Sequence, residues 1–266
     1  MAMKVAYKLS AVVAMVMLAQ SAFGLLLRGQ YRDVEWIAAT WLGNDWVTLV
    51  VALPVLTVGI VLTRGGSVRG LLLWLGALAY AIYNSAYYLF GAALNAFFPL
   101  YAATVIAAGV ALILTLSSIA PSGIARRFRT GTPAQLVGGY FVFVGLSLAT
   151  VWLGVWSAYV FAGRPLPIEP EAFKLVAALD IVLMAPPLAA GGILLWRRRA
   201  WGYVVSAIAG VQGSLYLLVL TVNSIIAIAH GRMQGAGELP MWGGLAAMTA
   251  AATLLLLGNV DGRMEA

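Results

Sequence analysis

Long apolar runs, separated by short polar or turn-forming segments, dominate the chain. A membrane-spanning helix needs about 20 predominantly apolar residues. The runs predict eight helices, at residues 9–27, 46–63, 70–91, 97–119, 135–161, 172–196, 201–229 and 240–259. The first run is longer than the hydrophobic region of a usual signal peptide, so we expect it to be a retained transmembrane helix. The pattern therefore predicts an all-α integral membrane protein, a bundle of about eight transmembrane helices.

The composition agrees with this pattern and excludes several kinds of chemistry. Of the 266 residues, 63% are hydrophobic and 9% are charged, whereas about 25% of the residues of a soluble domain are charged. There is no cysteine and a single histidine, His230, which excludes thiolate catalysis, iron–sulfur ligation and bis-histidine haem. The sequence also has no P-loop, HExxH motif or dinucleotide fingerprint. We therefore expect no cofactor and do not favour an enzyme.

Basic residues are unevenly divided between the two predicted ends of the helices. One end carries 11 of the 16: Lys4, Lys8, Arg64, Arg69, Arg126, Arg127, Arg129, Arg197, Arg198, Arg199 and Arg263. The other end carries Arg28, Arg32, Arg164, Lys174 and Arg232. The positive-inside rule places the first end, with both termini, in the cytoplasm. We expect a bacterial inner-membrane protein whose net charge of +7 sets its orientation and contacts anionic lipid, and we expect no nucleic-acid partner.

The two halves of the chain share a pattern of polar residues. The second predicted helix has Pro54 ten residues before Arg64, and the sixth has Pro187 ten residues before Arg197. An aspartate precedes each proline, although the spacing differs. The pattern predicts a duplicated four-helix unit, with domains at 1–132 and 133–266. Because four is an even number, the two units would have the same topology, as in transporters with parallel repeats.

Asp180 is the most costly polar residue in the predicted helices. A carboxylate that faces lipid costs about 2.5–3.5 kcal/mol on insertion scales, so its side chain should face the bundle interior. It could serve as a proton or cation site, or contact a polar substrate. Alternatively, it could be a structural carboxyl that accepts hydrogen bonds from tyrosine or asparagine. Asp45 is open to two interpretations as well, because it could cap the N-terminus of the second helix or lie at the mouth of a cavity.

Two further helices carry polar residues in the half predicted to lie outside. The third has tyrosine and asparagine at i, i+3, i+4 and i+7, the spacing of one helical face, and the seventh has a similar polar face. These residues could line a pocket, or they could join helices through hydrogen bonds. The candidate ligand-binding or coupling residues are Asp45, Tyr80, Tyr83, Asn84, Tyr87, Asp180, Gln212, Tyr216 and Asn223.

Three functions remain open. The leading hypothesis is a transporter or binding protein for a small polar or amphipathic solute or lipid, with an outward-facing polar pocket, Asp180 as the proton or cation site, and prolines that let helices two and six move. The second is a non-catalytic scaffold or sensor subunit that contacts a membrane-protein partner or forms a homo-oligomer. The third is a lipid-modifying enzyme that uses Asp45 and Asp180 together. No catalytic residue or metal ligand is assigned, and the lipid bilayer is the expected surrounding.

Overall fold

The computed structural model describes residues 2–229 and 237–261, and His230 lies outside them. The described helices are α1 (Ala2–Leu26), α2 (Glu35–Val47), α3 (Leu53–Arg64), α4 (Val68–Gly91), α5 (Phe98–Ser117), α6 (Pro121–Ala125), α7 (Ala134–Ala162), α8 (Pro170–Leu179), α9 (Ala185–Trp196), α10 (Ala200–Ala229) and α11 (Leu239–Gly258). A short 3₁₀ turn, η1 (Arg28–Gln30), follows α1. Single wide π-helical turns, η2 (Thr48–Ala52) and η3 (Asp180–Met184), join α2 to α3 and α8 to α9.

Seven helical segments within the described residues are long and apolar enough to cross a membrane. Two of them are the composite helices Ile37–Arg64 and Pro170–Trp196, which contain the wide turns. α4 is not among the seven, although it has 24 residues, because its tyrosines and Asn84 lower its mean hydropathy. The apolar helices fit an integral membrane protein surrounded by a lipid bilayer. An eighth span, formed by α4, stays a prediction.

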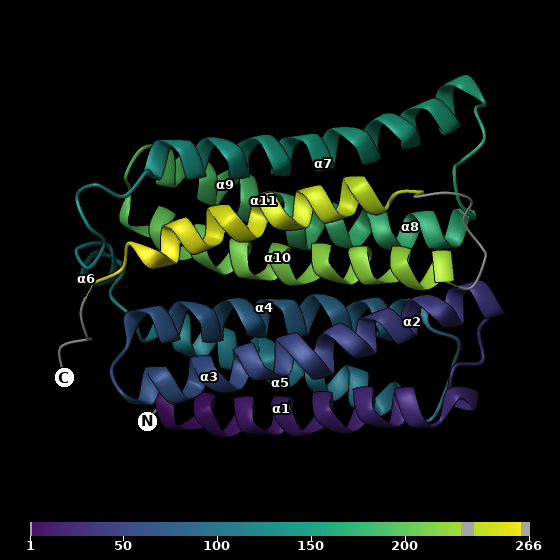
Figure 1. Cartoon of the computed structure of the whole chain (residues 1–266), viewed down its shortest axis with the longest axis horizontal. Helices are drawn as coiled ribbons and strands as arrows, with labels where there is room; N and C mark the ends of the chain where they lie inside the picture. Colours follow the sequence, from purple (N-terminus) through teal and green to yellow (C-terminus); the bar gives the residue numbers. More distant parts are fainter. Residues whose placement is uncertain (1, 230–236, 262–266) are drawn as a thin grey trace.

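The helices pack as two adjacent groups that follow the order of the chain. The first group is α1 to α5 and the second is α7 to α11, as Figure 1 shows by the change from purple and blue to green and yellow. Within the first group α3 packs on α4, α4 on α5 and α5 on α1, and within the second α7 packs on α9 and α10 on both α9 and α11. The groups meet where α4 packs against α10, α10 against α2, and α4 against α8.

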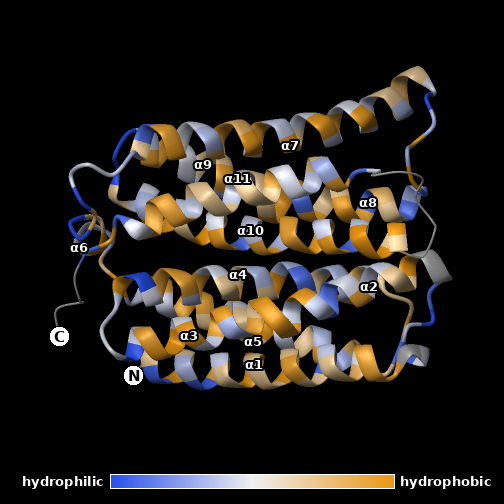
Figure 2. Cartoon of the chain, in the orientation of Figure 1, coloured by the Kyte–Doolittle hydropathy of each residue, from blue (hydrophilic) through white to orange (hydrophobic). Residues whose placement is uncertain are grey.

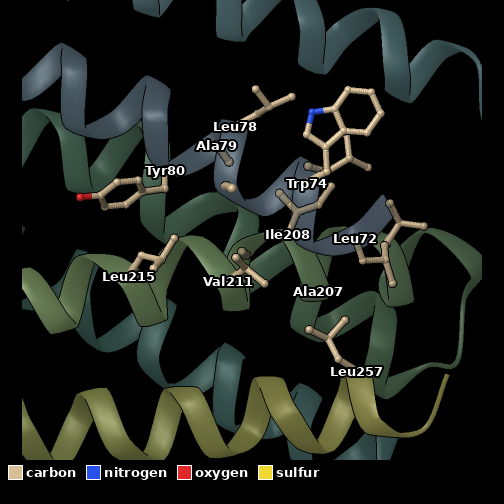
Figure 3. Packing of buried hydrophobic residues seen from close by; sticks show 14 of the residues in the cluster. Leu72, Trp74, Leu78, Ala79, Tyr80, Ala207, Ile208, Val211, Leu215 and Leu257 are labelled. Atoms are coloured by element: carbon tan, nitrogen blue, oxygen red, sulfur yellow. The ribbon is translucent and has the colours of Figure 1, made fainter. Parts of the chain in front are cut away.

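The core lies between α4 and α10. Figure 3 shows Trp74 and Tyr80 of α4 beside Ile208, Val211 and Leu215 of α10, and these five side chains are buried. In the most apolar stretch of α10, 67% of the residues are buried, whereas in the most apolar stretch of α7 the share is 22%. In a bilayer, lipid covers the exposed helices. The polar residues of the central helices α4 and α10 are therefore shielded from the hydrocarbon by the surrounding helices.

The two ends of the bundle differ in charge. The basic end, at the left of Figure 1, has the start of α1, the α3–α4 turn, α6 and the α9–α10 turn. Figure 2 shows hydrophilic residues concentrated at this end and at the opposite end, with hydrophobic residues along the helices between them. The tight turns have similar backbones, since Gly66 has φ 82° in the first and Arg198 has φ 52° in the second.

Most predicted helix boundaries agree with the structure to within two residues. The exceptions are the first two starts, because α1 begins at Ala2 rather than residue 9 and α2 begins at Glu35 rather than residue 46. The sequence Gly43-Asn44-Asp45 resembles a helix start, but the helix continues through it without a break. The interpretation of Asp45 as an N-terminal cap is therefore wrong.

Candidate functional site

Asp45 and Asp180 occupy equivalent depths in their helices. Asp45 lies ten residues after Glu35, the first residue of α2, and Asp180 lies ten residues after Pro170, the first residue of α8. At 1.5 Å per residue, each carboxyl group is about 15 Å along its helix from the end opposite the basic one. Both side chains are buried, with 0% and 2% exposure. Each aspartate must therefore be satisfied by neighbouring protein groups.

Asp45 accepts two hydrogen bonds from tyrosines. The hydroxyl of Tyr31 lies 2.5 Å from Oδ2, and the hydroxyl of Tyr88 lies 2.9 Å from Oδ1. Tyr31 is in the segment between α1 and α2, and burial together with the neighbouring carboxylate holds the pKa of its hydroxyl well above the usual range. Tyr31 therefore keeps its proton and donates a hydrogen bond to Asp45. Both tyrosines belong to a buried aromatic cluster with Trp41, Phe97 and Tyr101.

A chain of amide and hydroxyl groups, here called the amide network, links α10, α2 and α4. Asn223 donates to Asn44 Oδ1 (3.3 Å), and Asn44 donates to Asn84 Oδ1 (3.2 Å). Asn84 donates in turn to Thr48 Oγ1 (3.2 Å), which is hydrogen-bonded to the hydroxyl of Tyr80 (2.9 Å). The network joins the two groups of helices, since α10 belongs to the second group and α2 and α4 to the first.

Asp180 is held by donors from α4 and α7. The hydroxyl of Tyr83 lies 2.6 Å from Oδ1, and Trp152 Nε1 lies 2.8 Å from Oδ2. The ring of Tyr216 is 4.6 Å from that of Tyr83, measured between centroids. Lys174, the nearest lysine in the sequence, pairs with Glu171 at the exposed start of α8 instead. Among the described residues, Asp180 is therefore hydrogen-bonded by neutral groups and is not paired with a cation.

In the wide turn that begins at Asp180, one backbone carbonyl lacks its usual helical N–H donor. A side chain that is distant in sequence donates a hydrogen bond to it instead. Pro187 has no N–H to donate to the carbonyl of Leu183, four residues earlier. Gln212 of α10 donates to that carbonyl from Nε2 at 3.3 Å. Gln212 thus joins α10 to the proline-containing part of the composite helix α8–η3–α9.

The nine predicted residues occupy adjoining positions but make separate sets of contacts. Asp180, Tyr83 and Tyr216 form one set, and Tyr80, Asn84 and Asn223 belong to the amide network. Asp45 has different partners, and Gln212 contacts the wide turn. Tyr87 makes no polar contact with the described residues, although its ring packs against Trp41 at 5.1 Å.

Sequence reasoning missed five residues that complete these contacts. They are Tyr31, Asn44, Thr48, Tyr88 and Trp152. Asn44, Asp45 and Thr48 follow Trp41 at i+3, i+4 and i+7, so a helix drawn from Glu35 would have placed them on one face. Tyr31 and Trp152 carry no comparable signal, because one lies in a connecting segment and the other in a helix with an apolar pattern.

A groove of about 820 Å³, here called the lateral groove, opens between α2, α4 and α8. Its wall includes Thr40 and Trp41 of α2, Ala86 and Tyr87 of α4, and Ala178 of α8. Three charged residues, Glu169, Glu171 and Lys174, lie at its outer edge near the start of α8. Of the nine predicted residues, Tyr87 is the one that lines this groove.

A second, smaller groove of about 440 Å³ lies on the other side of α8, against α7. It is lined by Trp152, the donor to Asp180, and by Trp156, Phe173 and Lys174 among others. Lys174 lines both grooves. α8 therefore has open space on two sides, whereas α2 packs closely against α10.

Comparisons with known proteins identify no similar family, protein or structure. No protein-family model matches the chain, and neither a curated protein nor a solved structure matches it. Among the described residues there is also no group of three or more His, Asp or Glu side chains that could hold a metal ion.

Proposed function

We propose that the protein binds a small amphipathic solute in the lateral groove and transports it across the membrane. The observation that carries this proposal is that Tyr87 lies in a largely apolar wall of the groove and that its hydroxyl has no hydrogen-bond partner among the described residues. An apolar groove with a few convergent polar groups is the usual form of a small-molecule site. The charges of Glu169, Glu171 and Lys174 at the outer edge would contact the polar part of the solute, and the apolar wall would contact the rest.

The Asp180–Tyr83 pair lies directly behind this groove, which supports a coupling role for Asp180. Leu179, which precedes Asp180 at the end of α8, and Leu183, three residues after Asp180 in the wide turn, both line the groove. Tyr83 is one helical turn from Tyr87 on α4. A solute in the groove would therefore contact the segment that holds the carboxyl group of Asp180. A change in the protonation of Asp180 would in turn shift the residues that line the groove.

The surroundings of α8 support the movement that transport requires. A wide turn and Pro186-Pro187 separate α8 from α9, and such features are common points of helix bending. The grooves on both sides leave α8 room to move. The arrangement is suited to a rocking of α8 about the wide turn that alternately opens and closes the lateral groove.

We also propose that the chain is a duplication of a four-helix unit in the bacterial inner membrane. The equal depth of Asp45 and Asp180, the wide turns that follow, and the similar α3–α4 and α9–α10 turns support two parallel repeats. The concentration of arginine and lysine at one end supports an orientation with that end in the cytoplasm.

One observation favours the alternative of a non-catalytic scaffold subunit. Most of the predicted polar residues are hydrogen-bonded to groups on other segments of the bundle, as residues that only join helices would be. The third hypothesis, an enzyme with both aspartates in one site, is supported least, because Asp45 and Asp180 share no hydrogen-bond partner.

Asp180→Asn separates binding from coupling. Asp180 does not line the lateral groove, so any compound that copurifies with the wild type should also copurify with the variant. Uptake of that compound into proteoliposomes under a pH gradient should fall by at least about tenfold, because an amide cannot exchange the proton of an intramembrane carboxyl group. Asp261→Asn, the same substitution at an exposed position of the basic end, is the matched control. Wild-type uptake by Asp180→Asn would contradict the coupling role.

A further inference from the structure

The lateral groove carries more negative charge than positive. Its lining includes the carboxylates of Glu169 and Glu171 and the ammonium group of Lys174. Lys174 pairs with Glu171, so these two charges offset each other. Glu169 precedes α8 without capping it through its side chain, and its exposed carboxylate has no ion-pair partner among the described residues. One negative charge therefore remains at the outer edge of the groove.

The side-chain donors in the groove wall are nearly all engaged. The hydroxyl of Thr40 donates to the backbone carbonyl three residues earlier (2.7 Å), and Trp41 Nε1 donates to Asp33 Oδ2 (3.0 Å). Apart from the paired Lys174, this leaves the hydroxyl of Tyr87 as the side-chain donor that has no partner among the described residues. An anionic head would need several donors, whereas a cationic head needs acceptors, and the outer carboxylate and the Tyr87 oxygen are acceptors.

Aromatic side chains in the wall also favour a positively charged head. Tyr87 and Phe90, one helical turn apart on α4, both line the groove. The face of an aromatic ring attracts a cation, and quaternary ammonium groups are commonly recognised in this way. Asp33, which Trp41 Nε1 and the N–H of Ala93 (2.9 Å) hold in place, adds another carboxylate beside this wall.

The smaller groove on the other side of α8 has the opposite character. Of the residues described along its wall, Lys174 alone is charged, and it is a cation. The two grooves share α8, so their difference in charge comes from the carboxylates at the edge of the lateral groove. A cationic head would therefore enter the lateral groove in preference to the groove against α7.

We propose that the lateral groove selects an amphipathic solute with a cationic ammonium head. The head would lie at the outer edge beside Glu169, and the apolar part would extend along the wall toward Val182, which lines the groove deeper in the composite helix. This inference rests on the proposed function, because it names the chemical class of the solute that the groove binds.

The test is native mass spectrometry of the full-length protein in a nonionic detergent, with dodecyltrimethylammonium, dodecanoate or dodecanol added separately. The wild type should bind dodecyltrimethylammonium most tightly. Glu169→Gln should weaken binding of the cation and strengthen binding of the anion by about threefold each, as expected for one exposed charge. The ratio of the two affinities should therefore fall by about tenfold.

Glu238→Gln is the matched control for this variant. Glu238 precedes α11 as Glu169 precedes α8, and it does not line the lateral groove. Both residues are exposed and lie at the start of a helix, so the control also accounts for the effect of the helix dipole. Its affinity ratio should stay within about twofold of the wild-type ratio, because solvent screens charges that are far apart.

Ala178→Trp separates failure of this inference from failure of the proposed function. Ala178 is exposed and lines the groove, so a bulky side chain there should remove binding of all three probes. If the wild type bound the three probes equally, or preferred dodecanoate, and Ala178→Trp removed binding, the cationic class would be overturned and the solute site would stand. An unchanged ratio in Glu169→Gln would overturn it as well. Binding that Ala178→Trp leaves intact, or no binding at all, would contradict the proposed function and this inference together.

Discussion

Replacing Gly202 with alanine should lower the free energy of unfolding by about 3 kcal/mol, at the upper end of the range for overpacking. Gly202 lies in the first turn of α10, and its Cβ would be 2.2 Å from the backbone nitrogen of Leu195 and 2.3 Å from the carbonyl carbon of Leu194. Backbone atoms cannot move aside by changing rotamer. α9 and α10 would therefore have to separate, which would disturb the hairpin that ends the proline-containing helix.

The measurement is the unfolding of the purified protein by titration with denaturing detergent. Gly109→Ala is the matched control, since its Cβ on α5 would meet no atom within 4 Å. Gly70→Ala, at the corresponding place in α4, should have a somewhat smaller effect, because its closest contacts, with Leu62 Cβ at 2.4 Å and the backbone nitrogen of Thr63 at 2.8 Å, are longer than those at Gly202. If Gly202→Ala and Gly109→Ala had equal stability, the close packing of α9 on α10 would be contradicted.

Asp45→Ala should have the second largest effect, a loss of about 1–3 kcal/mol. The substitution leaves the buried hydroxyl of Tyr31 without its acceptor, and it leaves the buried hydroxyl of Tyr88 with the carbonyl of Trp41 (3.1 Å) as its remaining acceptor. Hydrogen bonds inside membrane proteins contribute about 0.6 kcal/mol on average and up to about 1.7 kcal/mol. Two such bonds, together with a small cavity, give the expected range.

A double-mutant cycle with Tyr88→Phe isolates one of these hydrogen bonds. The coupling energy between Asp45→Ala and Tyr88→Phe should be about 0.6–1.7 kcal/mol. Asp45→Asn, which retains the shape and one acceptor oxygen, should be less destabilised than Asp45→Ala. Strict additivity of Asp45→Ala and Tyr88→Phe would show that the two side chains do not interact as the structure places them.

The helices could be predicted from the sequence because membrane spans are defined by length and hydropathy alone. The prediction failed at the start of α2, where Gly43-Asn44-Asp45 has the composition of a turn. The helix continues there because Asn44 and Asp45 find partners on α4, α10 and the α1–α2 segment. Those partners are distant in sequence, so no local pattern could reveal them.

The site was predictable only in part for the same reason. The polar face of α4 could be identified from helical spacing, and it does meet Asp180 and the amide network. The donor Tyr31 comes from a connecting segment without helical periodicity, and the donor Trp152 comes from a helix with an apolar pattern. The lateral groove results from how far α8 stands from α4, which depends on packing and cannot be derived from hydropathy.

The measurement that tests the central proposal most directly is native mass spectrometry of the protein released gently from its own membranes. Ala178 lines the lateral groove and is exposed, so Ala178→Trp should fill the groove without entering the core. Ala11→Trp, at an exposed position of α1, is the matched control. A reproducible small-molecule or lipid adduct is predicted for the wild type and for Ala11→Trp, and its loss is predicted for Ala178→Trp. A copurifying protein partner without any adduct, or an adduct that Ala178→Trp retains, would contradict a solute site in the lateral groove.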